Sequence, residues 1–158
     1  MNATRFGELE VLCHAPERVT HEHPLLFVHG AYVSAWCWEE HFQPWFAHRG
    51  WSTYAVSLSG HGKSRKREHL DSYSIDDYVR DVAEVAARLP APPVLVGHSM
   101  GAVVIRAYAL KYPDRVAGLV AVDGRLDQRE WTRIEKREFL LTQEMVANQP
   151  LSCITQYR

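Results

Sequence analysis

The pentapeptide Gly97-His98-Ser99-Met100-Gly101 decides how the rest of the sequence is interpreted. Before it stands Pro93-Val94-Leu95-Val96, a short apolar and β-branched run that is typical of a buried strand. After it comes the apolar run 102–110, which is too long for an ordinary strand and indicates a mostly buried helix. Glycine is needed on both sides because a Cβ in so tight a turn would strike the strand or the helix. The stretch predicts a strained turn that lifts the Ser99 hydroxyl clear of the backbone, at the positive end of the helix.

A serine at such a turn matches G-x-S-x-G, the pattern of a serine exposed for nucleophilic attack. Its hydroxyl then needs a base to take the proton, and main-chain N–H groups aimed at the oxyanion that forms. Met100 offers one N–H directly after the serine. Ala31, in the loop after the apolar run Leu25–Val28, offers the other, because its small side chain leaves room for an acyl group. Two alternatives stay open: Ser99 only caps the helix, and His29 is only structural.

Strand-like and helix-like runs alternate along the rest of the sequence. Besides the run before the pentapeptide, strands are expected around 9–13, 25–28, 51–58 and 116–122. One helix is expected over 34–49, kinked or divided at Pro44, and another begins at Ser74, where Asp77 completes a capping pair. Such alternation builds a mostly parallel sheet with helices on both faces, which is the α/β class.

Sheets of this class place their sites at the carboxyl ends of the strands. Four features of the sequence are expected at such ends: His29-Gly30-Ala31, Gly60-His61-Gly62, the Ser99 turn and Asp123. Their convergence makes Asp123 and His61 further candidates for the site around Ser99.

Length and composition exclude several other classes. The chain has 158 residues and a formal net charge of −1, so no strong field favours nucleic acid or an anionic membrane. No stretch is long enough to span a bilayer and no apolar signal core is found, so we expect a cytoplasmic protein. Three widely spaced cysteines form no disulfide framework, and His21-Glu22-His23 lacks a third ligand, so we expect no metal and no other cofactor. A small-molecule substrate is the expected partner, and the oligomeric state stays open.

The sequence resembles the N-terminal part of an α/β-hydrolase over roughly residues 8–125. Four stretches carry the resemblance, in the family's order: Phe27–Ala31, Ser57–Ser64, Val96–Gly101 and Leu119–Gly124. Residues 29–38 are similar to the start of the plant-type methylesterase and hydroxynitrile lyase branch, in which the residue matching Ala31 donates an oxyanion-hole N–H. The resemblance implies part of a hydrolase core over 1–125 and the start of a helical cap over 126–158.

Two departures from the family pattern limit what the resemblance implies. The family's triad runs serine, acid, histidine along the chain, but all nine histidines here precede Ser99. Asp123 matches a position that is the acid in some members and structural in others, and we take it as the candidate acid. We therefore expect a piece of a larger hydrolase with little turnover of its own. In the second departure, Ser57 stands where the family often has the first aspartate of Asp-x-x-Gly-x-Gly-x-Ser.

The residues favour one function over its alternatives. The favoured function is hydrolysis of a carboxylic ester or similar acyl substrate through a Ser99 acyl-enzyme, with a lyase on the same scaffold left open. A catalytically inactive fragment or small-molecule binding module is the alternative, because the histidine is missing. A phosphate-binding loop at Gly62-Lys63-Ser64 is disfavoured, since Ser57 stands at the position of its first glycine. The basic run Arg65-Lys66-Arg67 is interpreted as solvated surface.

Overall fold

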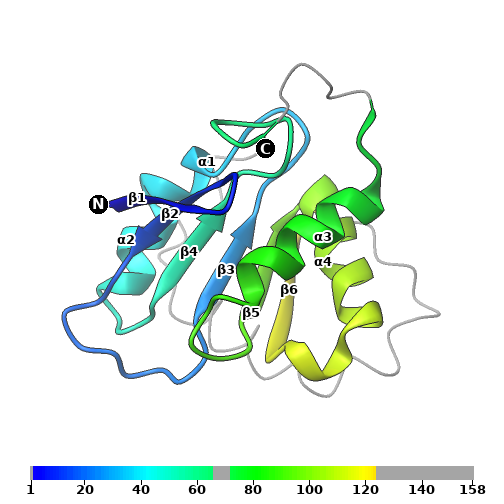
Figure 1. The fold of residues 1–158 in the computed structure, drawn as a ribbon. Coiled ribbons are helices and arrows are strands. Elements are labelled where there is room, and N and C mark those ends of the chain that lie inside the picture. The colour runs from blue at the N-terminus through cyan, green and yellow to red at the C-terminus, as the bar shows by residue number, and fades with distance from the viewer. Residues whose placement is uncertain (1, 66–71, 124–158) are drawn as a thin grey trace. The chain divides into compact units, whose positions relative to one another are not determined.

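The computed structural model describes residues 2–65 and 72–123 (Figure 1). The chain divides into two units, Met1–Arg125 and Leu126–Arg158, and every described residue belongs to the first. The predicted cap segment and the end of the basic run therefore lie outside the described residues. In the described part of the chain, no helix combines the length and apolarity needed to cross a membrane.

A mixed β-sheet organises the described residues (Figure 1). Its strands lie in the order β1-β2-β4-β3-β5-β6. They are β1 Asn2–Phe6, β2 Leu9–His14, β3 Leu25–Val28, β4 Thr53–Val56, β5 Val94–His98 and β6 Gly118–Val122. Strands β4, β3, β5 and β6 pair in parallel, whereas β2 pairs antiparallel with β1 and β4. The predicted α/β class with a mostly parallel sheet is confirmed.

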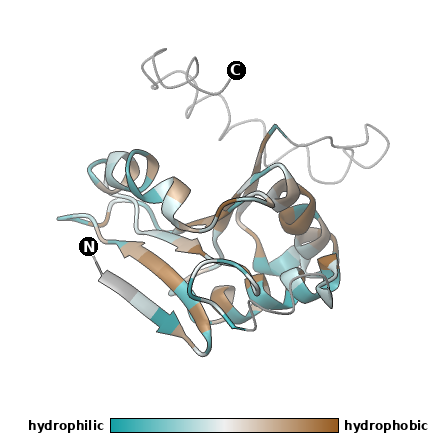
Figure 2. Ribbon diagram, turned by 90° about the horizontal axis from the view of Figure 1, so that it is seen from above, coloured by the Kyte–Doolittle hydropathy of each residue, from teal (hydrophilic) through white to brown (hydrophobic). Residues whose placement is uncertain are grey.

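Strand β1 has no counterpart among the predicted strands. It forms a hairpin with β2, in which Phe6 pairs with Leu9. Figure 2 shows that β2 is largely hydrophobic, whereas β1 at the edge of the sheet is not. Because an edge strand is held by main-chain hydrogen bonds to one neighbour, it needs no apolar pattern, and apolar runs in the sequence do not reveal it.

Strand β3 lies between β4 and β5, and all four of its residues are fully buried. Its Phe27 ring packs against Trp38 and Phe46, with ring centroids 4.9 and 5.9 Å apart. Trp38 belongs to α1 (Trp36–Glu39) and Phe46 to α2 (Phe42–Ala47). The aromatic residues that follow β3 in sequence therefore fold back and cover it, as continuous burial of a parallel strand requires.

The predicted division of the helix over 34–49 is found, since the structure has α1 and α2 in its place, but the predicted place of the division is wrong. The break falls at residues 40–41 and not at Pro44. Pro44 lies in the first turn of α2, where main-chain N–H groups have no partner within the helix, so its missing N–H breaks no helical bond.

Helix α3 (Ile75–Ala86) begins with the predicted capping pair. The Ser74 hydroxyl accepts a hydrogen bond from the Asp77 N–H at 3.3 Å, and the Asp77 carboxylate accepts one from the Ser74 N–H at 2.8 Å. Four of its apolar residues are buried: Tyr78, Val79, Val82 and Val85. Helix α3 packs against α4 (Met100–Lys111), which also contacts β3, β5 and β6. Helix α4, which begins two residues after β5 ends, is thus held against the sheet.

Candidate functional site

Ser99 occupies a strained turn between the end of β5 and the start of α4. Its φ of 52° and ψ of −114° lie in a region that non-glycine residues rarely adopt. A Cβ built on Gly97 would lie 2.5 Å from the Gly101 carbonyl oxygen, and one on Gly101 would lie 2.3 Å from that of Val28. Both glycines are therefore required by close backbone approach, as the sequence predicts. Ser99 is exposed, and its hydroxyl has no hydrogen-bond partner among the described residues.

The ends of three parallel strands meet around this turn. The Ser99 N–H donates to the Val122 carbonyl at 3.0 Å, which joins the turn to the end of β6. Asp123 follows directly, with a φ of 49°. On the other side, a Cβ on Gly30 would lie 3.0 Å from His98 Nδ1, so the loop after β3 packs against the turn. The structure therefore places the predicted site residues of β3, β5 and β6 at one edge of the sheet.

Two main-chain N–H groups are candidates to face a substrate at this edge. Met100 is the first residue of α4, so its N–H has no partner within the helix. Ala31 follows β3 and is exposed. Asp123 is also exposed, and within residues 2–65 and 72–123 it makes no hydrogen bond or ion pair. The edge thus offers a free hydroxyl, free N–H groups and one free carboxylate.

Besides His98, which ends β5, two histidines lie beside this edge, and each of these two has both ring nitrogens engaged. The Leu58 N–H donates to His29 Nε2 at 3.0 Å, and His29 Nδ1 lies 2.7 Å from the Gly30 carbonyl oxygen. His61 Nε2 lies 2.9 Å from the Ala31 carbonyl oxygen, and its Nδ1 lies 3.1 Å from that of Ser59. Because both rings are held by other groups, neither is placed as the base for Ser99.

The burial of His29 predicts a loss of stability in mild acid. Burial lowers the pKa of His29 from 6.5 to about 4. Between these values the unfolded chain binds more protons than the folded one, so the free energy of unfolding falls as the pH decreases, by up to about 3 kcal/mol. Urea unfolding at pH values from 7 to 4 measures this loss. It should disappear in His29→Asn and persist in His41→Ala, whose ring is exposed; equal pH profiles for the wild type and His29→Asn would contradict it.

Ser57 stands at the position of the first aspartate of Asp-x-x-Gly-x-Gly-x-Ser, and Glu10 supplies a carboxylate beside it. The Ser57 hydroxyl donates to Glu10 Oε2 at 2.7 Å and accepts from the Ala35 N–H at 3.1 Å. The same Glu10 oxygen accepts the Lys63 N–H at 3.0 Å. A residue of the antiparallel strand β2 therefore holds the loop after β4. Because a carboxylate already takes the Lys63 N–H, the loop is also unsuited to a phosphate, which argues against the nucleotide-binding alternative.

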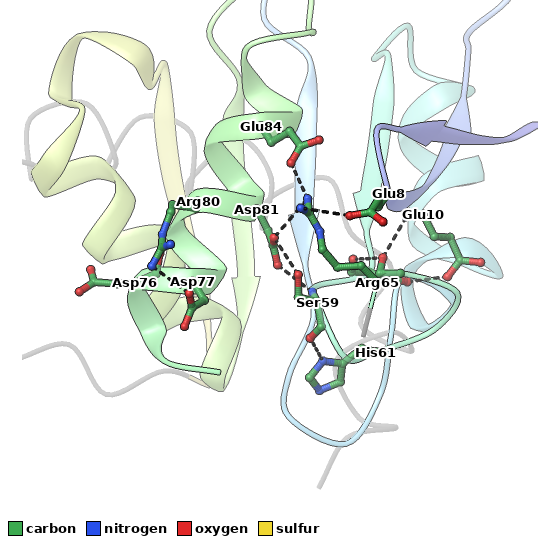
Figure 3. Close-up of polar contacts among 12 residues, drawn as sticks. Glu8, Glu10, Ser59, His61, Arg65, Asp76, Asp77, Arg80, Asp81 and Glu84 are labelled. Atoms are coloured by element: carbon green, nitrogen blue, oxygen red, sulfur yellow. Dashed lines mark hydrogen bonds and ion pairs between the residues drawn. The ribbon is translucent and has the colours of Figure 1, made fainter. Parts of the chain in front are cut away.

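Asp81 and Arg65 fix the same loop onto α3 (Figure 3). Asp81 is buried and accepts hydrogen bonds from the Ser59 N–H at 2.7 Å and from the Ser59 hydroxyl at 2.9 Å. Arg65 forms ion pairs with Glu8, Asp81 and Glu84. Burial raises the pKa of Asp81, although the bonds from Ser59 and the charge of Arg65 oppose that rise. The interpretation of Arg65 as solvated surface is therefore wrong: its side chain is 26% exposed and bound to three carboxylates.

Removing the Asp81 carboxylate is expected to destabilise the fold. Asp81→Ala leaves a buried N–H and a buried hydroxyl without an acceptor, which should lower the free energy of unfolding by about 2–4 kcal/mol. Asp76→Ala is the control, because Asp76 is exposed in the same helix, and its loss should stay below about 1 kcal/mol. Urea unfolding of both variants tests this, and equal losses would contradict the assigned role of Asp81.

The carboxylates of Asp81 and Glu10 are not among the predicted residues, although the sequence contains a signal for Asp81. Asp81 lies three residues after Tyr78 and four before Val85, on the apolar side of the predicted helix. Glu10 alternates with the buried residues Leu9 and Val11 in a predicted strand, which is the ordinary place of a polar side chain on the opposite face, so no signal marks it. A charged residue on the apolar face of a helix, such as Asp81, indicates a buried partner.

The two histidines considered for a metal site, His21 and His23, have other contacts. His21 stacks on Trp51, with ring centroids 3.8 Å apart, and His23 Nδ1 lies 2.9 Å from the Pro92 carbonyl oxygen. No group of three or more metal-ligating side chains is found in the described part of the chain. Burial raises the pKa of Cys13 to about 11 and that of Cys37 to about 12, so both thiols stay protonated at neutral pH.

Comparison with known proteins identifies the family. Residues 23–156 match the sequence profile of the alpha/beta hydrolase fold. This chain belongs to the alpha/beta hydrolase fold family. Strands β3 to β6 of this hydrolase-fold chain, with α4 after the Ser99 turn, fall within the matched region.

Relatives of this hydrolase-fold chain include several named hydrolases. It is 33% identical to a pyrethroid hydrolase of Sphingobium wenxiniae over 61% of this chain and 34% of that protein. It is 32% identical to epoxide hydrolase B of Mycobacterium tuberculosis over 63% of this chain and 28% of that protein. The chain thus spans about a third of the length of these curated relatives.

Solved structures of named hydrolases share the fold. A thioesterase domain from the curacin biosynthetic pathway is 31% identical, with a TM-score of 0.64 over 87% of this chain and 46% of that one. An epoxide hydrolase from Vigna radiata is 25% identical, with a TM-score of 0.67 over 77% of this chain and 38% of that one.

Proposed function

We propose that this chain carries the nucleophile-bearing part of a serine hydrolase that acts on a carboxylic ester or similar acyl substrate. The observation that carries the proposal is the exposed Ser99, held at a φ of 52° between β5 and α4 with its hydroxyl unpartnered among the described residues. The relatives support it, since they are named as hydrolases, and one similar structure is a thioesterase domain.

The proposed reaction is acyl transfer through Ser99. Its Oγ attacks the carbonyl carbon of the substrate while a base takes the hydroxyl proton. The carbonyl oxygen becomes an oxyanion, which the Ala31 and Met100 N–H groups bind. Each donor of this kind is worth about 10²–10³-fold in rate. The C–O bond to the leaving alcohol then breaks, the alcohol takes the proton from the base, and water releases the acyl group from Ser99 by the same steps.

We propose that the base is an imidazole from a part of the protein beyond this sequence. All nine histidines of the sequence precede Ser99, and the rings of His29 and His61 have both nitrogens engaged. Asp123 is the proposed acid that orients the imidazole. It is adjacent to Val122, whose carbonyl accepts the Ser99 N–H, and its carboxylate is free among the described residues.

Active-site labelling tests the proposal on the complete protein. A fluorophosphonate probe should attach to Ser99, because only a serine activated by a base and an oxyanion hole reacts rapidly with it. Trypsin then yields the peptide Leu89–Arg106, in which Ser99 is the sole serine, so mass spectrometry locates the adduct without ambiguity. Heat-denatured protein is the control and should not react. Absence of an adduct on this peptide would contradict the proposal.

A small-molecule binding module without chemistry is the second candidate. It is favoured by the engagement of both ring nitrogens of His29 and of His61, which leaves neither of these imidazoles placed to act on Ser99. The two candidates differ in turnover. Binding of an ester or lactone raises the melting temperature of a binding module, but the module releases no alcohol. Thermal shift and product release, measured on the complete protein with the same esters, separate them.

A further inference from the structure

The exposed apolar side chains of the described residues gather at the edge of the sheet that holds Ser99. Most of the large ones end a parallel strand, follow one, or lie in the first turn of a helix that begins at this edge: Tyr32, Trp36, Ile75, Val103 and Val122. Val19, before β3, and Leu110, where α4 ends, lie at the opposite edge. Apolar side chains that are exposed together on one face mark a binding surface.

Two of these residues stand on either side of Ser99. The serine follows β5, and β5 lies between β3 and β6. On the β3 side, Tyr32 comes directly after Ala31, so the two Cα atoms are about 3.8 Å apart. Tyr32 is 101% exposed, so no described residue covers its ring. On the β6 side, Val122 is 40% exposed, and its carbonyl accepts the Ser99 N–H at 3.0 Å.

The proposed reaction fixes where a substrate lies between these residues. The oxyanion is bound by the N–H groups of Ala31 and Met100, so the carbonyl carbon is held one residue away from Tyr32. The acyl chain and the alcohol both extend from this carbon along the edge of the sheet. Because removing apolar surface from water is favourable, a bulky apolar group beside the carbonyl binds more tightly than a small one.

The charges around Ser99 disfavour an anionic substrate. The stretches 29–36, 99–103 and 122–123 contain no lysine or arginine, and Asp123 is their only acidic residue. Burial lowers the pKa of His29 to about 4, so this ring is neutral at pH 7. Arg65, in the loop after β4, is already paired with Glu8, Asp81 and Glu84. A substrate carboxylate would therefore meet no cation here and would be repelled by Asp123.

We propose that Tyr32 is a specificity-determining residue that packs against a bulky apolar group beside the reacting carbonyl, so that the substrate is an uncharged aromatic or long-chain aliphatic ester. The inference rests on the proposed function, because Ser99 and the Ala31 N–H fix where the carbonyl lies. Tyr32 supplies apolar surface and takes no part in the acyl transfer itself.

Two variants of the complete protein test the role of the ring. Tyr32→Ser removes it, and Tyr32→Phe keeps it without the hydroxyl. We expect Tyr32→Ser to lower kcat/KM by at least about tenfold for ethyl benzoate or benzyl acetate, and by less than about threefold for ethyl acetate. A loss on either aromatic ester supports the inference and shows on which side of the carbonyl Tyr32 lies.

The controls separate the ring from its hydroxyl and from exposed apolar surface in general. Tyr32→Phe should keep kcat/KM for both aromatic esters within about threefold. Val19→Ser should change none of the three values, because Val19 is 60% exposed at the opposite edge of the sheet. An equal loss in Tyr32→Ser and Tyr32→Phe would overturn the inference, because the hydroxyl and not the ring would then be responsible.

A second pair of esters tests the charge of the substrate. Ethyl pentanoate and monoethyl succinate have similar length, but only the succinate carries a carboxylate. The wild type should have a kcat/KM at least about tenfold higher for ethyl pentanoate. Equal values, or a preference for monoethyl succinate, would overturn the inference.

Binding without turnover separates this inference from the proposed function. In a Ser99→Ala background, calorimetric titration with the aromatic esters should give a Kd at least about tenfold weaker when Tyr32→Ser is added. If the wild type hydrolyses no ester, the proposed function fails, while this difference in Kd still decides the role of Tyr32. If the wild type is active and Tyr32→Ser lowers kcat/KM for all three esters equally, or for none, the inference fails alone.

Discussion

Replacing Ser99 by alanine in the complete protein is expected to lower kcat for a p-nitrophenyl ester by at least about 10⁴-fold. The Ser99 Oγ is the atom proposed to form the acyl-enzyme, and no other hydroxyl occupies the turn between β5 and α4. Initial rates at saturating ester measure the loss. Stability should change little, because the Ser99 hydroxyl makes no hydrogen bond within the described residues.

Ser52→Ala is the matched control for this experiment. Ser52 precedes β4 and therefore lies at the amino end of the strands, opposite the candidate site. Its variant should keep kcat within about twofold, since surface substitutions away from a site are usually near neutral. Ester turnover in Ser99→Ala that stays within tenfold of the wild type would exclude Ser99 as the nucleophile.

Gly101→Ala is expected to have the largest effect on folding. The new Cβ would lie 2.3 Å from the Val28 carbonyl oxygen and 2.7 Å from that of His29. Both atoms belong to the backbone at the end of β3, so neither moves without displacing the central strand. The free energy of unfolding should fall by at least about 3 kcal/mol. Urea unfolding of the complete protein measures this loss.

Gly30→Ala is the control for the steric argument. The nearest atom to its Cβ would be His98 Nδ1 at 3.0 Å, which belongs to a side chain that rotates away at small cost. Its stability should therefore stay within about 1.5 kcal/mol of the wild type. If Gly30→Ala and Gly101→Ala lose equal stability, close backbone approach is not the reason for glycine at position 101.

Local patterns in the sequence predict the central strands and the Ser99 turn. Strand β3 is predictable because four consecutive apolar residues, Leu25–Val28, are all buried. The Ser99 turn is predictable because its two glycines and its serine lie within five residues, and each answers a steric or chemical demand of the same turn. Features fixed by neighbouring residues can therefore be predicted from the sequence alone.

The contacts that hold the loop after β4 depend on residues far apart in the chain. Asp81 is separated from Ser59 by 22 positions, and Glu10 from Ser57 by 47. No local pattern contains such pairs, so the sequence alone does not explain the Ser57 departure, whereas the structure places Glu10 beside it. The two engaged rings of His29 and His61 are likewise a result of tertiary contacts.

The position of the oxyanion tests the central claim most directly. A crystal structure of the complete protein inhibited by a phosphonate would carry a tetrahedral phosphorus on the nucleophile, with one oxygen in place of the oxyanion. We predict phosphorus bonded to Ser99 Oγ and that oxygen within about 2.7–3.1 Å of both the Ala31 and Met100 nitrogens. Phosphorus on another residue, or an oxygen turned away from these two N–H groups, would contradict the proposed mechanism.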